Sequence, residues 1–349
     1  MSHTRRPFRP PGMGHDAAGG THTGTGSGTG SGAEGAAARG AGEAGLARAF
    51  EAERPRLLRV AYATLGSLAE AEDCVQEAWL RLRRLPEPGE IRDLGAWLTT
   101  VVGRLALDAL GTARARRERY VGTWLPEPLV ERAGRAGDPA DRVTLDESVS
   151  MALLVVLERL SPAQRTAFLL HDVFRLSFEE VAEVVGRSPA AVRQLASRAR
   201  RQVDGHSPRQ PPTRAEQAEL VRAFLVACRR GELRRLLELL DPDAVFRGDG
   251  GGNVSALPRV LTGADAVARV LVAYHRRPPR AVHPADVNGE PGVVLVDATG
   301  VLTVIALTVD AGRVTAVDVV RNPEKLTALR LDLLPEAAWE GELWADGTD

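Results

Sequence analysis

Apolar residues recur at spacings of three and four across residues 177–203 and predict two helices joined by a tight turn. Ser177 and Glu180 form a capping box for the first helix, and Gly186 suits its left-handed end. Ser188 caps the second helix, and a proline follows in its first turn. This helix buries a stripe consisting of Val192, Leu195, Ala199 and Val203. Its other face carries Arg193, Gln194, Ser197, Arg200 and Arg201. The pattern is typical of a helix-turn-helix that enters the DNA major groove, although a surface helix pair with a solvated arginine face also fits.

Upstream, order is expected to begin near Leu46, with a first helix pair perturbed by Pro55. Ser67 and Glu70 form a capping box for a helix that runs to about Leu85. Its core stripe consists of Val75, Ala78, Trp79 and Leu82. Its opposite face presents Asp73, Gln76, Glu77 and Leu80. An exposed leucine among carboxylates and an amide is more typical of a docking surface than of a solvated face.

A loop at 85–93 leads to a long helix from about Leu94 to Arg119, with Asp93 as its cap. The first half of this helix is apolar, and the second half is rich in arginine. A basic helix end with a tryptophan near the other end suits phosphate contact and base stacking. For the Trp97 ring taken alone, a place in the hydrophobic core is the favoured interpretation.

After Asp204 the pattern changes to that of an α+β domain, preceded by a polar, proline-containing hinge. The predicted elements are, in order, helices near Ala215 and at Glu232–Leu240, a strand near Ala244–Arg247, a helix at Ala264–Tyr274, and β-rich runs at Gly292–Ala298, Val301–Val309 and Val314–Val320.

Composition limits the classes of function. The 349 residues carry a formal net charge of −1, so DNA contact has to come from local basic patches. Lys325 is the only lysine, which makes abundant arginine weak evidence by itself. Cys74 and Cys228 indicate neither a disulfide framework nor a metal site, and no apolar run approaches the roughly 20 residues that span a membrane. We therefore expect a cytoplasmic protein without a membrane partner, metal or cofactor.

The order of these motifs resembles that of bacterial sigma-70-family initiation factors of the extracytoplasmic-function group. The resemblance covers about Leu46 to Val203, through EDCVQEAWLRL, AWLTTVVGRLALDAL and the helix-turn-helix segment. It implies that core RNA polymerase, through the clamp helices of its largest subunit and its flap, and promoter DNA are the partners. Polymerase-binding residues would be Asp73, Gln76, Glu77 and Leu80. The −10 element would be read by Arg92, Trp97, Thr100, Arg104 and Asp108. The −35 element would be read by Ser188, Ala190, Ala191, Arg193, Gln194, Ser197, Arg198 and Arg201.

The linker motif YVGTWLPEP resembles that of the sigma-J-like subgroup, which carries a fused SnoaL-like (NTF2-like) domain and needs no separate anti-sigma factor. Thr123 and Asn253 depart from the subgroup, which usually has proline and lysine there. A stiff polyproline spacer is the alternative explanation of the motif. The resemblance implies regulatory contacts at Tyr120, Trp124, Pro126, Asp249, Gly250, Gly251, Gly252, Asn322, Pro323 and Lys325.

We therefore expect all-α sigma-2 and sigma-4 domains followed by an α+β SnoaL-like domain, with no catalytic residue. The expected segments are a disordered extension 1–45, region 2 at 46–118, a linker 119–142, region 4 at 143–204, a hinge 205–214, the SnoaL-like domain 215–334 and a tail 335–349. The alternative is a polyketide-cyclase-like enzyme or small-ligand binder with an accessory DNA-binding region. For that alternative Asp249, His275, His283 and Asp286 are the available groups, but their spacing forms no dyad. Whether the C-terminal domain activates or inhibits stays open.

Overall fold

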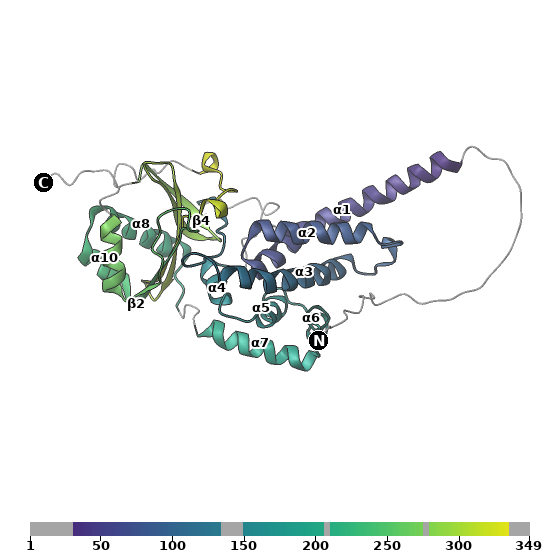
Figure 1. The fold of residues 1–349 in the computed structure, drawn as a ribbon, viewed down its shortest axis with the longest axis horizontal. Helices are drawn as coiled ribbons and strands as arrows, with labels where there is room; N and C mark the ends of the chain where they lie inside the picture. The colour runs from purple at the N-terminus through teal and green to yellow at the C-terminus, as the bar shows by residue number, and fades with distance from the viewer. Residues whose placement is uncertain (1–30, 134–148, 206–209, 275–278, 335–349) are drawn as a thin grey trace, which may run out of the picture. The chain divides into compact units, whose positions relative to one another are not determined.

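The computed structural model describes residues 31–133, 149–205, 210–274 and 279–334 (Figure 1). By packing, the chain divides into a unit that ends at Ala49 and a unit that begins at Phe50. Helix α1, Ser31–Leu65, crosses this boundary. The predicted start of order near Leu46 is therefore too late, because the alanine-rich sequence after Ser31 favours a helix. The extension 1–30 lies outside the described residues.

Helix α1 also corrects the predicted helix pair, since Pro55 lies inside one continuous helix. Proline removes one helical hydrogen bond. Burial of Leu57 and Val60, each with 0% exposure, stabilises the helix through its tertiary contacts instead. The first helical domain continues with α2, Leu68–Arg83, a 3₁₀ turn at Pro88–Glu90, and α3, Leu94–Arg117. Asp93 caps α3 as predicted, accepting from the Ala96 N–H at 2.9 Å.

The second helical domain contains α4, Met151–Leu157, α5, Pro162–Phe168, a π-helical turn at Leu169–Val173, α6, Phe178–Val185, and α7, Pro189–Asp204. The predicted caps of the helix-turn-helix are confirmed. Ser177 and Glu180 form the capping box, Gly186 has φ 68°, and Ser188 accepts from the Ala191 N–H. The predicted stripe needs one correction, because Ala196 rather than Leu195 is buried on α7. Ala196 lies on the same face as Val192, Ala199 and Val203, at spacings of four, three and four residues.

The α+β domain contains three helices and a mixed sheet. The helices are α8, Arg214–Arg230, α9, Leu233–Leu239, and α10, Ala264–Tyr274. Its strands are β2, Leu240–Asp249, β3, Leu261–Thr262, β4, Ala281–Val287, β5, Glu290–Val296, β6, Leu302–Asp310, and β7, Arg313–Val320. Short 3₁₀ turns follow at Pro323–Lys325 and Leu331–Leu333. The predicted order of two helical domains and an α+β domain is confirmed.

The sheet gains one strand from the linker. Strand β1, Val130–Arg132, pairs antiparallel with β4, and the full order is β1-β4-β5-β6-β7-β2-β3. Neighbouring strands are antiparallel except for β2 and β7. The sequence pattern missed β1, β4 and the two-residue strand β3. Pro284 interrupts the alternation in β4, and β1 has only three residues, so neither carries a clear period of two.

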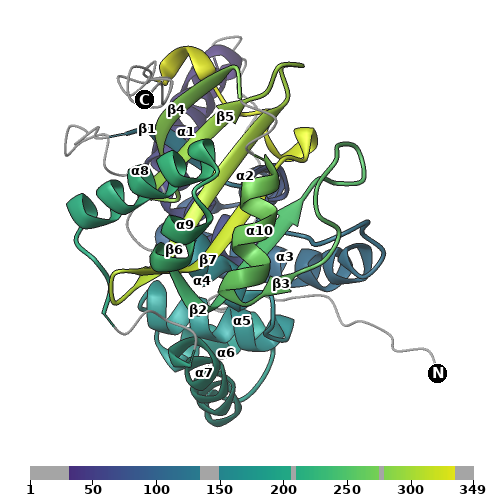
Figure 2. The same cartoon turned by 90° about the vertical axis from the view of Figure 1, so that its left-hand side faces the viewer.

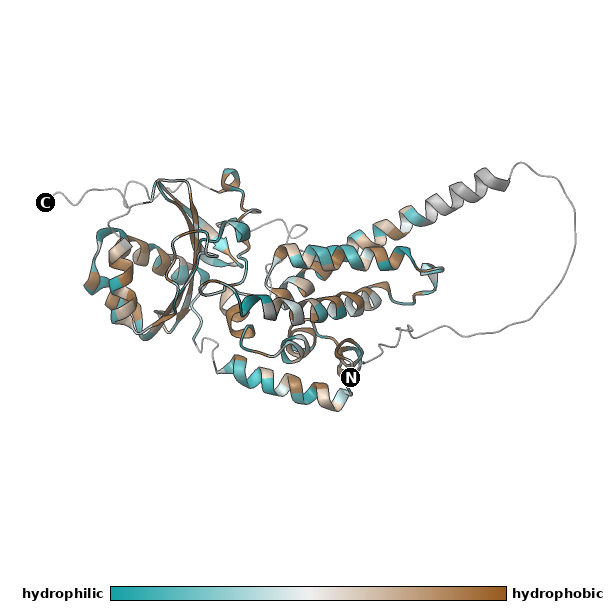
Figure 3. Cartoon of the chain, in the orientation of Figure 1, coloured by the Kyte–Doolittle hydropathy of each residue, from teal (hydrophilic) through white to brown (hydrophobic). Residues whose placement is uncertain are grey.

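The two faces of this sheet pack against different parts of the chain. Helices α8, α9 and α10 cover one face, through a core that includes Phe224, Leu236 and Phe246 (Figure 2). On the other face, Leu125 from the linker and Met151 from α4 pack with strand residues. Figure 3 shows hydrophobic residues concentrated along the strands and in α10, whereas α7 is largely hydrophilic. Among the described residues no helix is long and apolar enough to cross a membrane.

Candidate nucleic-acid interface and linker junctions

Helix α7 presents the predicted −35 residues on one surface. The exposed residues among them are Ser188, Ala190, Arg193, Gln194, Ser197, Arg198 and Arg201, while Ala191 is half-buried. The Arg193 side chain is 56% exposed, 3.6 Å from Glu179 and 5.0 Å from the centre of the Phe178 ring. Arg200 instead pairs with Asp172, its Nε 2.9 Å from Oδ1. Arg200 is thus paired with a largely buried carboxylate, whereas the contact of Arg193 with Glu179 joins two exposed side chains.

The predicted −10 surface on α3 is partly covered by the second helical domain. Arg104 donates from Nε and Nη2 to the Glu183 carbonyl of α6, at 3.0 and 2.6 Å. One residue earlier, a Cβ built on Gly103 would lie 3.0 Å from Val184 Cγ1. Glycine thus lets α3 and α6 approach closely. Of the remaining predicted −10 residues, Arg92 and Asp108 are exposed, and Trp97 and Thr100 are half-buried.

The predicted polymerase-binding residues share one face of α2. Asp73 and Gln76 are exposed, and Glu77 and Leu80 are half-buried. Glu77 pairs with Arg81 at 3.0 Å, four residues along the helix. The cap of α2 differs from the prediction. Ser67 accepts from the Glu70 N–H, but instead of a reciprocal bond from Glu70, Glu127 of the linker accepts from the Leu68 N–H at 2.8 Å and from Ser67 Oγ at 3.2 Å. The linker therefore caps this helix.

Asp249 organises a first contact between the linker and the α+β domain. Its carboxylate is fully buried and accepts from Tyr120 Oη at 2.6 Å, the Leu125 N–H at 2.9 Å and Lys325 Nζ at 2.7 Å. Asn322 Nδ2 donates to Tyr120 Oη at 2.8 Å. We call the cluster of Tyr120, Trp124, Asp249, Asn322 and Lys325 the linker junction.

Electrostatics in the linker junction follow from burial. Burial lowers the pKa of the Lys325 ammonium, and the neighbouring Asp249 carboxylate opposes that effect. Burial also raises the pKa of Tyr120, and its hydrogen bond to Asp249 raises it further, so the phenol keeps its proton and donates. Lys325 Nζ lies 4.1 Å from the centre of the Trp124 ring, a cation–π arrangement. The lysine is held here by the Asp249 carboxylate, the Leu125 carbonyl and the faces of the Trp124 and Tyr120 rings.

The glycines of the predicted DGGGN motif are required by close packing. Gly251 has φ +64°, and a Cβ there would lie 2.4 Å from Asn322 Cγ. A Cβ on Gly250 would lie 2.3 Å from the Val254 carbonyl oxygen, and one on Gly252 would lie 3.2 Å from Val121 Cβ. Pro126 is buried near Gly66, whereas Pro323 is exposed and begins a 3₁₀ turn. All predicted regulatory residues except Pro323 thus lie in or beside packed contacts.

Sequence reasoning missed a second contact, centred on the turn between β4 and β5. Asn288, 7% exposed, donates from Nδ2 to Tyr62 Oη at 2.7 Å, and its own N–H donates to the Leu129 carbonyl at 2.8 Å. The Leu129 N–H returns a bond to Asn288 Oδ1 at 3.2 Å, and Tyr62 Oη donates to the Glu127 carbonyl at 2.7 Å. We call Tyr62, Glu127, Leu129 and Asn288 the hairpin junction. The Asn-Gly pair signals a hairpin turn in the sequence, but nothing local reveals its partners.

Two arginines that sequence reasoning also missed satisfy the end of α1. Arg165 of α5, 1% exposed, donates from Nη2 to the Ala63 carbonyl at 3.0 Å, and Arg117 of α3 donates to the Leu65 carbonyl. Both guanidiniums also bind Glu158. Cations suit the negative end of the helix dipole, and the last turn of α1 has no basic residue of its own.

The groups considered for catalysis do not form an active site in the described part of the chain. Asp249 is occupied by the linker junction, and Asp286 pairs with Arg214. His283 is half-buried on β4, and His275 lies outside the described residues. The face of the sheet beneath α8 and α10 is filled with apolar side chains.

Comparisons with known proteins agree with this division of the chain. The family described as sigma-70 region 2 matches residues 49–116, and sigma-70 region 4 matches residues 150–203. The chain is 44% identical over 295 residues to the ECF RNA polymerase sigma factor SigJ of Mycobacterium tuberculosis, covering 80% of this chain and 92% of that protein. It is 37% identical to the probable ECF sigma factor SigI of the same species, covering 82% and 96%. The crystal structure of SigJ matches with a TM-score of 0.67 and 42% identity, covering 80% of this chain and 98% of that one.

Proposed function

Because this chain belongs to the extracytoplasmic-function (ECF) RNA polymerase sigma factors, it binds core RNA polymerase and directs initiation at promoters, and we propose how its surfaces share that task. The helical domains are sigma regions 2 and 4, and the α+β domain is a fused SnoaL-like domain. Its close relatives are sigma factors, which are not enzymes. As a partner of the polymerase it acts in the cytoplasm.

We propose that α7 reads the −35 element, that α3 with the preceding loop reads the −10 element, and that the Asp73–Leu80 face binds the clamp helices. Region 4 would contact the polymerase flap. The exposure of Arg193 and Gln194 on α7 supports the first assignment. For the third, Asp73→Ala and Gln76→Ala should each reduce association with core polymerase while leaving thermal unfolding unchanged, because both residues are exposed. Unchanged capture of core polymerase contradicts that assignment.

We further propose that the described conformation is a closed state that cannot bind both promoter elements. The observation that carries this proposal is the contact of Arg104 on α3 with Glu183 on α6. The −10 and −35 elements are about 25 base pairs apart, roughly 85 Å of B-DNA at 3.4 Å per base pair. Because α6 and α7 pack together in the helix-turn-helix, contact between α3 and α6 holds the two reading helices closer together than that separation. Regions 2 and 4 therefore have to separate before a promoter complex forms.

The SnoaL-like domain is well placed to control that separation. The linker junction and the hairpin junction tie it to the linker, and Asn288 also reaches Tyr62 of region 2 and, from Nδ2 at 3.4 Å, the Val149 carbonyl before α4. A domain that binds the closed arrangement better than the open one shifts the population toward the closed state. Polymerase binding would reverse that shift. This built-in control would make a separate anti-sigma factor unnecessary.

A reversible cross-link tests the closed state. The 3.0 Å spacing between a Cβ at Gly103 and Val184 Cγ1 suits a disulfide between cysteines introduced at both positions. The oxidised Gly103→Cys, Val184→Cys chain should fail in run-off transcription with core polymerase, and reduction should restore the transcript. Each single variant, treated with the same oxidant, controls for Cys74 and Cys228. A fully active oxidised chain contradicts the closed-state proposal without affecting the family assignment.

Truncation tests control by the fused domain. Chains that end at Asp204 or at Asn322 should differ from the full-length protein in transcript yield at limiting sigma concentration. The first lacks the whole SnoaL-like domain, and the second lacks Lys325 of the linker junction. If both truncations give the full-length yield, the domain has no control function.

A further inference from the structure

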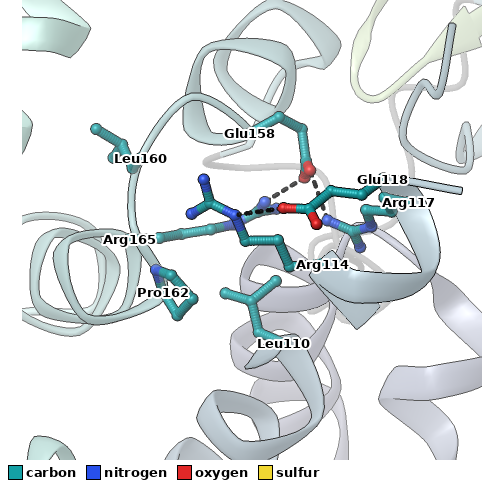
Figure 4. Close-up of a pocket in the computed structure, with 8 residues that line it drawn as sticks. All are labelled: Leu110, Arg114, Arg117, Glu118, Glu158, Leu160, Pro162 and Arg165. Atoms are coloured by element: carbon teal, nitrogen blue, oxygen red, sulfur yellow. Dashed lines mark hydrogen bonds and ion pairs between the residues drawn. The ribbon is translucent and has the colours of Figure 1, made fainter. Parts of the chain in front are cut away.

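A cavity of about 240 Å³ lies between the end of α3 and the turn that joins α4 to α5 (Figure 4). Region 2 contributes one wall, and region 4 contributes the other. The cavity therefore exists in this form only while the two regions are together. Its lining consists of Leu110, Arg114, Arg117 and Glu118 from one side and Glu158, Leu160, Pro162 and Arg165 from the other.

The buried charges of this cavity are unbalanced. The side chains of Arg117 and Arg165 are 12% and 1% exposed, and both bind the same carboxylate, Glu158. Within the lining of the cavity, one carboxylate thus pairs with two buried guanidiniums, and incomplete pairing of buried charge is costly. Burial lowers the pKa of Arg117, the carboxylates of Glu158 and Glu70 oppose this effect, and the nearby positive charge of Arg165 adds to it. The carbonyls of Ala63 and Leu65 and the Trp124 ring, whose centre lies 3.7 Å from the Arg117 guanidinium, offset only part of the excess, since they carry partial charges.

Arg114 supplies a third guanidinium at the mouth of the cavity. Its side chain is 54% exposed, and its Nε lies 3.8 Å from Glu118 Oε1, which belongs to a side chain that is 71% exposed. An exposed pair of this kind is weak and rearranges at little cost. Figure 4 shows the Arg114 side chain in the cavity with Arg165 and Glu158 beyond it.

We propose that this cavity binds the phosphate group of a small phosphorylated ligand. A phosphate monoester carries a charge between −1 and −2 at neutral pH and three acceptor oxygens, which offset the positive excess. The planar guanidinium of Arg114 can bind two of these oxygens at once, and Arg117 has donors left after its bonds to Glu158 and Leu65. Leu110, Leu160 and Pro162 form an apolar wall that suits a small apolar group on the ester.

The consequence for transcription rests on the proposed function. A ligand held by both walls binds the closed state better than the open one, so it stabilises the closed state. By reciprocity, separation of regions 2 and 4 releases the ligand. A small phosphorylated metabolite that binds this cavity would then reduce initiation. The cavity is distinct from the junctions made by the SnoaL-like domain.

Calorimetry on the full-length chain tests the site directly, with inorganic phosphate and phenyl phosphate at constant ionic strength. We expect saturable binding, with phenyl phosphate tighter because of the apolar wall. Arg114→Ala should weaken binding about tenfold or more, the size expected for a charge-assisted hydrogen bond. Arg159→Ala removes the same charge from an exposed neighbour of Glu158 that does not line the cavity, and it should bind like the wild type. Absence of saturable binding, or equal binding by the Arg114 variant, overturns the proposal.

Run-off transcription assays distinguish the phosphate-site proposal from the closed-state proposal. Phenyl phosphate should lower transcript yield with the wild type and have much less effect with Arg114→Ala. Binding without any effect on yield overturns the regulatory role while the phosphate site stands. An active oxidised Gly103→Cys, Val184→Cys chain overturns the closed state, whatever calorimetry gives.

Discussion

The Asn288 side-chain amide donates to the Tyr62 hydroxyl at 2.7 Å, which joins residues that are 226 positions apart in the chain. This bond connects the β4–β5 turn of the SnoaL-like domain to α1 of region 2. Tyr62 also binds the linker, because its hydroxyl donates to the Glu127 carbonyl. Glu127 in turn caps α2, the helix with the predicted polymerase-binding face. The hairpin junction therefore connects the fused domain to the helix that is proposed to bind the polymerase.

Asn288→Asp should destabilise the protein and weaken the closed state. The substitution keeps the shape and the positive φ of 51° but replaces two donated bonds, to Tyr62 Oη and the Val149 carbonyl, by a carboxylate oxygen. A buried unsatisfied polar group costs about 1–3 kcal/mol, and a charged one costs more. Thermal unfolding measures the loss. Asn253→Asp, at an exposed asparagine, should have little effect, and equal unfolding temperatures of the two variants contradict the assigned role of Asn288.

Gly251→Ala should cost more than Gly312→Ala. Both glycines have positive φ, +64° and +73°, which costs an alanine roughly 1–2 kcal/mol. A Cβ at Gly251 would also displace Asn322, 2.4 Å away, and so disturb its bond to Tyr120. A Cβ at Gly312 meets nothing within 4 Å. Urea unfolding of the two variants isolates the packing contribution, and equal losses would mean that the linker junction tolerates the added methyl group.

Glu127→Gln should change how stability depends on pH. Burial raises the pKa of Glu127 above 4.5, although the bonds from Leu68 and Ser67 oppose the shift. The folded chain thus binds this proton more tightly than the unfolded chain. Its contribution to stability is complete below pH 4.5 and is lost as the pH rises through the folded-state pKa. Glutamine cannot ionise and should not show this loss.

The unfolding temperature of Glu127→Gln minus that of the wild type should therefore increase between pH 4.5 and pH 7. Thermal unfolding across this interval measures the difference. Glu219→Gln, an exposed carboxylate on α8, controls for the general effect of removing a negative charge. A difference that stays constant or falls with pH is inconsistent with a raised pKa at Glu127.

Arg193→Ala should weaken DNA binding selectively at one −35 position, by about 1–3 kcal/mol, if its guanidinium reads a base edge. The measurement is the affinity of the protein in its open state for DNA duplexes that carry the −35 element and differ at single positions. Arg200→Ala should show no such selectivity, because Arg200 is paired with Asp172. A uniform loss for Arg193→Ala across all duplexes would indicate phosphate contact instead.

The ends of the two helices of the helix-turn-helix could be predicted from the sequence, because their signals are local. Ser177 with Glu180, Gly186, and Ser188 with Pro189 act within a few residues of their own positions. The predicted capping box of α2 had the same local signal, yet the N-terminus of this helix is completed by Glu127, sixty residues away, which accepts from Ser67 Oγ and the Leu68 N–H. Helix α1 likewise depends on contacts that are distant in sequence, since burial of its C-terminal half stabilises the helix despite Pro55.

Patterns in the sequence predict the ends of the helix-turn-helix, the order of the three domains and the basic face of α7, and the resemblance in the linker indicated the residues that meet in the linker junction. That β1 joins the sheet, that Asn288 meets Tyr62, and that Arg104 on α3 binds the Glu183 carbonyl emerges only from the folded chain. The difference lies in the sequence distance over which each interaction acts. Caps and helical periodicity depend on neighbours within one or two turns, whereas a buried polar group takes whichever partner the fold brings within 3 Å. The contacts that would hold the proposed closed state are between residues that only the fold brings together.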